Sequence, residues 1–208
     1  RNAVINNNLG DLYISLNENA KALDYYKEAL SSNLKNYKNT HNGYSAPLIK
    51  DYVGWEELLK TLLSVAGIFE DNHEDFPDLD YQSGLKSALH YYQACDSLIS
   101  EVRKVMKTKS DKLTLGEQST IVYKKAVGVC NELIQTVSDK KLKMKYKMLA
   151  FYFSEKNKSS VLMEALAGAE AQKFSGIPEN LLKKESKILT DINYYKKLLS
   201  EEPDSASE

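Results

Sequence analysis

The stretch Ala3–Leu34, AVINNNLGDLYISLNENAKALDYYKEALSSNL, decides how the rest of this 208-residue chain is interpreted. Two sets of residues in it recur at helical spacing, first Leu9, Gly10 and Tyr13, then Ala22, Tyr26 and Ala29. Residues at such intervals share one face of a helix. Small residues such as Gly10 and Ala22 let two antiparallel helices approach closely, and the tyrosines fill the space beside them. The stretch therefore predicts a helical hairpin.

These six positions resemble the signature of the tetratricopeptide repeat, a helix–turn–helix unit of about 34 residues, although its usual final proline is absent. The same offsets recur in Val65, Ala66 and Phe69, and then in Ala88, Tyr92 and Cys95. The interval from Ala66 to Ala88 is 22 residues, against 12 in the first pair, and the extra residues fall around the acidic loop 71–80. The sequence therefore predicts a second, stretched repeat. The alternative at each place is an ordinary amphipathic hairpin.

Long helices are predicted for the remainder, because 9 glycines and 4 prolines leave few breaks in the chain. Apolar stripes favour helices over 79–106, 113–136 and 142–174, and an amphipathic helix over 175–202. Lysine and apolar residues alternate over 141–147, which is typical of a strand, but no partner strand is predicted elsewhere. We therefore expect helix there as well.

The predicted fold class is all-α, a tetratricopeptide-like helical hairpin solenoid with two clear repeats, one degenerate repeat and long helices. Because a single hairpin cannot bury its apolar face alone, stacking is expected to supply the core. The predicted segments are a tetratricopeptide-like repeat (1–36), a second, stretched repeat with inserted loops (37–107), a degenerate third hairpin (108–174), a C-terminal amphipathic helix leading to a missing downstream domain (175–202) and a tail (203–208).

A second resemblance covers most of the chain. The motifs AFYFSEKNKSSVLMEAL (150–166) and GIPENLLKKE (176–185) are similar to the stretch that precedes the peptidase domain in bacterial CHAT-domain proteins. The segments LIKDYVGWEELLKTLL (48–63) and ALHYYQACDSLI (88–99) fit the stretched repeats of that family. Such proteins couple tetratricopeptide repeats to a caspase-like cysteine peptidase. The resemblance implies the repeat region without its peptidase domain, so no catalytic residue is carried over.

The composition is that of a globular protein with almost balanced charge, with 28 basic residues, 29 acidic residues and 42% hydrophobic residues. A net charge of −1 argues against nucleic-acid and membrane partners. The charge is unevenly distributed, since residues 51–100 carry −8 and residues 101–150 carry +7, so we expect one acidic and one basic face. The basic stretch 140–147 predicts a solvated face or a contact with an acidic surface. Because the chain begins at Arg1 without a signal-peptide pattern, we expect part of a longer, cytoplasmic protein.

Candidate catalytic and metal-binding groups are few. Cys95 and Cys130 could act as nucleophiles with one of the three histidines as base. Both cysteines fall at small or apolar positions of predicted helices, where a free cysteine is commonly a buried hydrophobe. The loop 71–80 has Phe76 and Gln82 where an EF-hand needs glycine and glutamate, so a solvated loop is expected. We predict no catalytic residue, metal site or cofactor in this chain.

Partner-binding residues follow from the resemblance to tetratricopeptide repeats, in which the first helix of each pair lines a groove. The residues that this pattern places in the groove or at its edge are Asn7, Asn8, Asp11 and Ser15 in the first repeat, and Lys60, Leu63 and Glu70 in the second. An asparagine amide both donates and accepts, so it can bind the backbone of an extended peptide. The alternative for the asparagines is helix-start chemistry and solvent exposure.

The function expected from these features is that of a non-catalytic, regulatory protein-interaction region. Its partner would be a protein, a peptide or the adjoining domain of the same protein. A second hypothesis is a stand-alone scaffold or oligomerisation module, which would pair through the apolar stripe over 181–199. A third is an enzyme whose site lies in this chain, which would require a convergent cysteine–histidine or carboxylate cluster.

Overall fold

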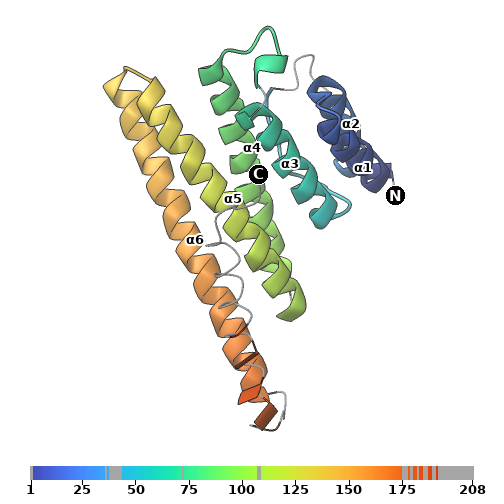
Figure 1. Ribbon diagram of the computed structural model, residues 1–208, viewed down its shortest axis with the longest axis vertical. Coiled ribbons are helices and arrows are strands. Elements are labelled where there is room, and N and C mark those ends of the chain that lie inside the picture. The colour runs from blue at the N-terminus through green and yellow to red at the C-terminus, as the bar shows by residue number, and fades with distance from the viewer. Residues whose placement is uncertain are drawn as a thin grey trace, which may run out of the picture. The chain divides into compact units, whose positions relative to one another are not determined.

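The computed structural model describes residues 2–35, 37, 44–71, 73–106 and 109–174, and scattered positions from 178 to 191. These described residues form six α-helices and one 3-10 turn, which confirms the all-α class (Figure 1). The elements are α1 (Asn2–Ser15), α2 (Asn19–Asn33), α3 (Trp55–Asp71), η1 (His73–Asp75), α4 (Tyr81–Val105), α5 (Lys109–Thr136) and α6 (Lys140–Phe174). By its contacts the chain divides into two units, Arg1–Glu164 and Ala165–Glu208. In the first unit, α3 and α4 lie between the α1–α2 pair and the α5–α6 pair (Figure 1).

The α1–α2 hairpin forms because the chain reverses sharply between two helices with small contact residues. Asn17 adopts a left-handed backbone angle, φ 57°, which asparagine tolerates better than most residues. The N–H of Glu18 then donates to the Tyr13 carbonyl at 2.9 Å, and the N–H of Asn17 donates to the Ile14 carbonyl at 3.0 Å. This pair of bonds is the Schellman arrangement, which satisfies the last carbonyls of α1. The prediction of a hairpin from the opening stretch is confirmed.

Helix α3 is the centre of the core, because it packs against α1, α2 and α4. Its buried side chains include Leu58, Leu62, Val65 and Phe69. The Phe69 ring lies 5.8 Å from the rings of both Phe76 and Tyr91. This aromatic cluster fastens the segment after α3 onto the second helix pair. The predicted hairpin of α3 and α4 is therefore present, with the inserted segment packed against it.

The acidic segment 71–80 is only partly the solvated loop that the sequence predicts. Phe76 and Leu79 are buried, although the acidic composition of the segment favours exposure. The Asp75 carboxylate accepts a hydrogen bond from the Asn19 amide of α2 at 2.6 Å. Asp80 is the N-cap of α4 and accepts from the Ser83 N–H at 2.7 Å. Two of its carboxylates thus have structural roles that composition alone did not indicate.

The connection from α2 to α3 is held by one asparagine. The Asn33 side-chain oxygen accepts from the N–H groups of Val53 and Gly54, both at 3.0 Å, and its amide donates to the Gly54 carbonyl at 2.9 Å. An isolated antiparallel bridge joins Leu34 to Tyr52 beside it. Asn33 is buried, and both the oxygen and the nitrogen of its side-chain amide form hydrogen bonds, as a buried polar group requires.

Helix α6 settles the conflict over residues 140–149 in favour of helix. Asp139 begins it, since its carboxylate accepts from the N–H groups of Lys141 and Leu142. Tyr146, Phe153 and Ser160 are buried at seven-residue intervals, and the Phe153 ring lies 6.2 Å from that of Tyr123 in α5. Helical spacing of the buried residues, and not the alternation of lysines, therefore decides the local structure.

The predicted C-terminal helix (175–202) and tail (203–208) lie almost wholly outside the described residues. None of the helices in the described part of the chain is both long enough and apolar enough to cross a membrane.

Gly10 offers a direct test of the α1–α2 contact. A Cβ at this position would lie 2.5–2.8 Å from three ring carbons of Tyr26, and that ring is buried and fixed by a hydrogen bond to Asp11. We expect Gly10→Ala to lower the free energy of unfolding by about 1–3 kcal/mol, because the overpacked ring must move. Urea unfolding measures the change.

Gly128→Ala is the matched control, because nothing lies within 4 Å of a Cβ at that helical position. There we expect a gain of up to about 1 kcal/mol from helix propensity. If the two substitutions had the same effect, the close packing of Tyr26 on Gly10 would be refuted.

Candidate interaction surface

Asn7 is not free to bind a peptide, because it is fully buried between α1 and α3. Its amide nitrogen donates to the Glu57 carboxylate at 2.8 Å and to the Glu57 carbonyl at 3.2 Å. Its amide oxygen accepts from the Thr61 hydroxyl at 2.8 Å. The donor and acceptor capacity that suggested peptide recognition is therefore used inside the protein, to join the first helix pair to the second.

Asp11 and Lys60, both expected in the groove, meet at the same junction. The Tyr26 hydroxyl of α2 donates to the Asp11 carboxylate of α1 at 2.6 Å. The Lys60 ammonium of α3 lies 2.8 Å from the other oxygen of that carboxylate. Burial, and next the hydrogen bond to Asp11, raise the pKa of the Tyr26 hydroxyl. We call this Tyr26–Asp11–Lys60 group the first brace, since it ties three helices together.

A second brace has the same composition at the next junction. The Tyr92 hydroxyl of α4 donates to the Glu70 carboxylate of α3 at 2.5 Å, and the Lys125 ammonium of α5 lies 3.3 Å from the same oxygen. Burial and the bond to Glu70 raise the pKa of the Tyr92 hydroxyl. Glu70 is thus a junction residue, with its side chain only 15% exposed. In each brace a tyrosine of the second helix and a lysine of the next pair share one carboxylate of the first helix.

The remaining groove residues stay near the surface. Asn8 and Ser15 are exposed, although the Ser15 hydroxyl donates to the Leu12 carbonyl at 2.6 Å, and Leu63 is half-buried against the core. Two large apolar residues of α1, Ile5 and Leu12, are about half exposed beside Asn8. We use the name α1 face for the surface that includes Ile5, Asn8, Asp11, Leu12, Ser15 and Lys60.

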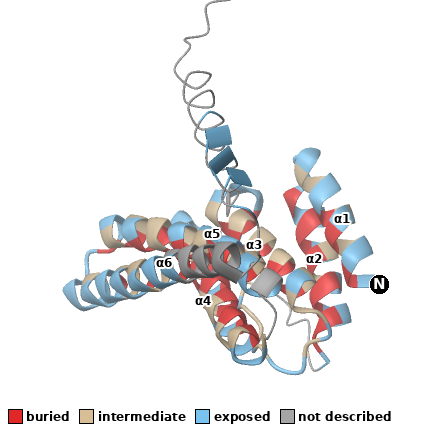
Figure 2. Ribbon diagram, turned by 90° about the horizontal axis from the view of Figure 1, so that it is seen from below, coloured by how far each residue is buried: buried red, intermediate tan, exposed pale blue. Residues whose placement is uncertain are grey.

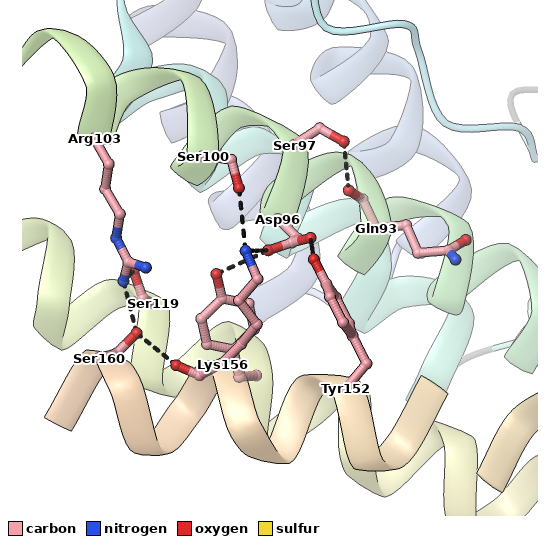
Figure 3. Close-up of polar contacts among 10 residues, drawn as sticks. Gln93, Asp96, Ser97, Ser100, Arg103, Ser119, Tyr152, Lys156 and Ser160 are labelled. Carbon is pink, nitrogen blue, oxygen red and sulfur yellow. Dashed lines mark hydrogen bonds and ion pairs between the residues drawn. The ribbon is translucent and has the colours of Figure 1, made fainter. Parts of the chain in front are cut away.

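A polar cluster separate from the two braces joins α4 to α5 and α6 and was not predicted from the sequence (Figure 3). The Asp96 carboxylate of α4 accepts from the hydroxyls of Tyr123 at 2.9 Å and Tyr152 at 2.7 Å. The Lys156 ammonium lies 3.5 Å from both Asp96 and the Ser100 hydroxyl, and it also covers the Tyr152 ring. Burial and the bond to Asp96 raise the pKa of the Tyr152 hydroxyl to about 12. One carboxylate again serves several elements.

Arg103 extends this cluster by two helical turns. Its guanidinium donates to the Ser160 hydroxyl of α6 at 2.6 Å and to the Ser119 hydroxyl of α5 at 3.3 Å. Both serines are fully buried, and their hydroxyls donate hydrogen bonds to the backbone carbonyls of Leu115 and Lys156. Figure 3 shows Arg103 and Ser160 reaching toward each other from facing helices. The arrangement supports packing of the last two helices on α4.

A polar cleft of about 590 Å³ opens beside Asp96, between α4 and the connection that precedes α3. Its charged lining residues are Lys50, Asp51, Asp96 and Glu101, together with the hydroxyls of Ser97 and Ser100. Asp51 has a left-handed backbone angle, φ 50°, in the wall of the cleft. The cleft is acidic and open, which suits solvent or a basic side chain more than the enclosed pocket of a small-molecule site.

Both cysteines belong to the hydrophobic core. Cys95 and Cys130 are fully buried free thiols. Burial raises the pKa of both, to about 12 for Cys130, so the reactive thiolate is disfavoured. Of the histidines, His41 and the side chain of His73 lie outside what the structure describes, and no hydrogen bond joins His90 to either thiol in the described part. Among the described residues, no group of His, Cys, Asp and Glu side chains is placed to hold a metal ion.

Comparison with known proteins gives no relative. No protein-family model matches the chain, and no curated protein or solved structure matches it either.

The two braces are expected to contribute unequally to the free energy of unfolding. We expect Tyr92→Phe to lower the free energy of unfolding by about 1.5–3 kcal/mol, because a buried hydrogen bond to a carboxylate is lost. Lys60→Met should cost less than about 1 kcal/mol, since Lys60 and Asp11 are both more than 40% exposed. Urea unfolding of each variant measures the difference.

Tyr146→Phe controls for loss of a hydroxyl, because Tyr146 is buried and its hydroxyl has no hydrogen bond within the described part of the chain. It should change the free energy of unfolding by less than about 0.5 kcal/mol. Equal costs for Tyr92→Phe and Tyr146→Phe would contradict the second brace.

The rate of thiol modification tests whether Cys95 and Cys130 are buried and unreactive. We expect both to react with a chromogenic disulfide at pH 8 roughly 100-fold more slowly in the folded chain than in 6 M guanidinium, because burial blocks access and disfavours the thiolate. Single Cys→Ser variants assign the rates. If either thiol reacted as fast in the folded chain as in the unfolded chain, the interpretation of both cysteines as buried core residues would be contradicted, and the enzyme hypothesis would be favoured.

Proposed function

We propose that this chain is a non-catalytic helical-repeat region of tetratricopeptide type that binds a protein or peptide partner. The observation that carries the proposal is the α1 face. There Ile5 and Leu12 are 52% and 51% exposed around the exposed amide of Asn8. Exposed apolar residues grouped with polar ones are typical of protein-interaction sites.

The two braces support the repeat part of the proposal. Each joins the first helix of one pair to the second helix of that pair and to the first helix of the next. Such nearest-neighbour bonding is what a stack of repeats requires. The packing of Tyr26 on Gly10 supports the same reading, because it places an aromatic ring against a small residue at the offset that the repeat signature uses.

We further propose that the chain is the repeat region of a CHAT-type peptidase protein. The support for this is the resemblance of the motifs in 150–166 and 176–185. In such a protein the repeats would bind a partner or the peptidase domain and so regulate it. The buried thiols support a non-catalytic role for the chain itself.

Peptide selection tests the binding role. Random 16-residue peptides displayed on phage are selected on the immobilised 208-residue chain, and the affinities of the selected peptides are measured by fluorescence anisotropy. We expect Leu12→Glu to weaken them about tenfold or more, because a charge replaces an apolar contact at the centre of the α1 face. Asn8→Ala should weaken them less.

Leu48→Glu is the control, since Leu48 is 81% exposed and lies outside the α1 face. Selected peptides that bound all these variants equally would refute the α1 face as the site. If selection enriched no peptide at all, the binding role itself would be refuted.

A further inference from the structure

The outward side of α6 carries a row of uncovered apolar side chains. Met144, Met148 and Phe151 are 58%, 67% and 68% exposed, and Leu162 is 60% exposed. They lie opposite the buried side of the helix, because Met148 follows the buried Tyr146 by two residues, or about 200° of helical rotation. Figure 2 shows the first turns of α6 exposed along their outer side. We call Met144, Met148, Phe151 and Leu162 the α6 ridge.

The spacing of the ridge is that of a helix-pairing seam. Intervals of four and three residues separate Met144, Met148 and Phe151. The next two positions of the pattern, before Leu162, hold Glu155 and Lys158, which form an ion pair. Apolar residues in this pattern make a narrow stripe that a second helix covers by knobs-into-holes packing. Methionine adapts its shape to such partners. A bilayer surface favours a broader apolar face than a stripe one side chain wide.

Lysines border the ridge on both sides. Residues 140–154 contain Lys140, Lys141, Lys143, Lys145 and Lys147 and no acidic residue. All but Lys143 are exposed, and none of the five forms an ion pair within the described part of the chain. The apolar seam is therefore flanked by uncompensated positive charge.

This charge opposes the stability of α6. The N-terminal end of a helix carries the positive end of the backbone dipole, where lysines are unfavourable. The Asp139 carboxylate caps this end of α6, but the first turn itself holds no acidic residue. Lys141 and Lys145, and likewise Lys143 and Lys147, are like charges four residues apart, which repel. Five lysines therefore follow a single capping carboxylate, and such an excess of like charge is expected where another molecule supplies the opposite charge.

We propose that the α6 ridge binds an amphipathic helix of a partner protein, whose apolar stripe is bordered by aspartate and glutamate. Acidic flanks would pair with the lysines, as charges at the edges of a coiled-coil seam do. A second copy of this chain fits less well, because residues 140–154 hold no acidic residue to pair with these lysines, and a parallel copy opposes each lysine with itself. The inference rests on the proposed function for the kind of partner and names a surface separate from the α1 face.

The test uses the full 208-residue chain and a synthetic helical peptide of three heptads, with leucine at the seam positions and glutamate at the flanking positions. Fluorescence anisotropy at low ionic strength measures binding. We expect Met148→Glu and Phe151→Glu each to weaken binding at least tenfold, because a charge enters the seam. The double variant Lys145→Glu/Lys147→Glu should weaken binding of the glutamate-flanked peptide by a similar factor. It should instead bind the peptide in which lysine replaces the flanking glutamates.

Leu48→Glu and Lys124→Glu, at exposed positions outside the ridge, are the matched controls and should change binding less than twofold. Circular dichroism verifies that every variant remains helical. Equal binding of glutamate- and lysine-flanked peptides, or no binding of either, would overturn the proposal. Binding of phosphatidylserine vesicles without the peptide would overturn it in favour of a bilayer, and self-association lost in Met148→Glu would overturn it in favour of a second copy. None of these outcomes alters the peptide selection on the α1 face.

Discussion

A carboxylate that serves two neighbours at once closes each junction between successive helix pairs. Asp11 and Glu70 both accept from a tyrosine of their own pair and attract a lysine of the next. Burying a tyrosine hydroxyl without a partner is costly, so these carboxylates have to lie at the junction. Polar groups that the junctions bury are not available for binding. This removes Asn7 and Glu70 from the candidate binding residues, whereas Asp11 and Lys60 stay more than 40% exposed at the α1 face.

The all-α class and the helix positions could be predicted, because helical periodicity and the small residues at Gly10 and Ala22 are local signals. The braces could not be predicted. Asp11 and Lys60 lie 49 residues apart, and their meeting depends on how one pair packs on the next. Asn7 shows the same limit, since an asparagine on a first helix serves a groove or a buried junction equally well. Only the position of Thr61 and Glu57 on α3 decides between the two.

The structure also changes the meaning of the uneven charge. Part of the acidic block 51–100 is paired internally with the basic block that follows it, as Glu70 with Lys125. Asp96 is likewise paired with Lys156 of α6. Residues 140–147 are different, because their lysines have no such partners in the described part of the chain. Exposed lysines without ion pairs in the described part of the chain therefore lie at the start of α6, whereas part of the acidic block is bound at the helix junctions.

The first brace has a consequence for how the chain folds as it is made. The Asn7 amide and the Asp11 carboxylate cannot find Thr61 and Lys60 until about 50 more residues have left the ribosome. At typical rates of synthesis that delay is roughly 2–10 seconds, far longer than a helical hairpin needs to form. During this interval the side of α1–α2 that later meets α3 is uncovered. The first hairpin thus waits with this side exposed to solvent until α3 has been made.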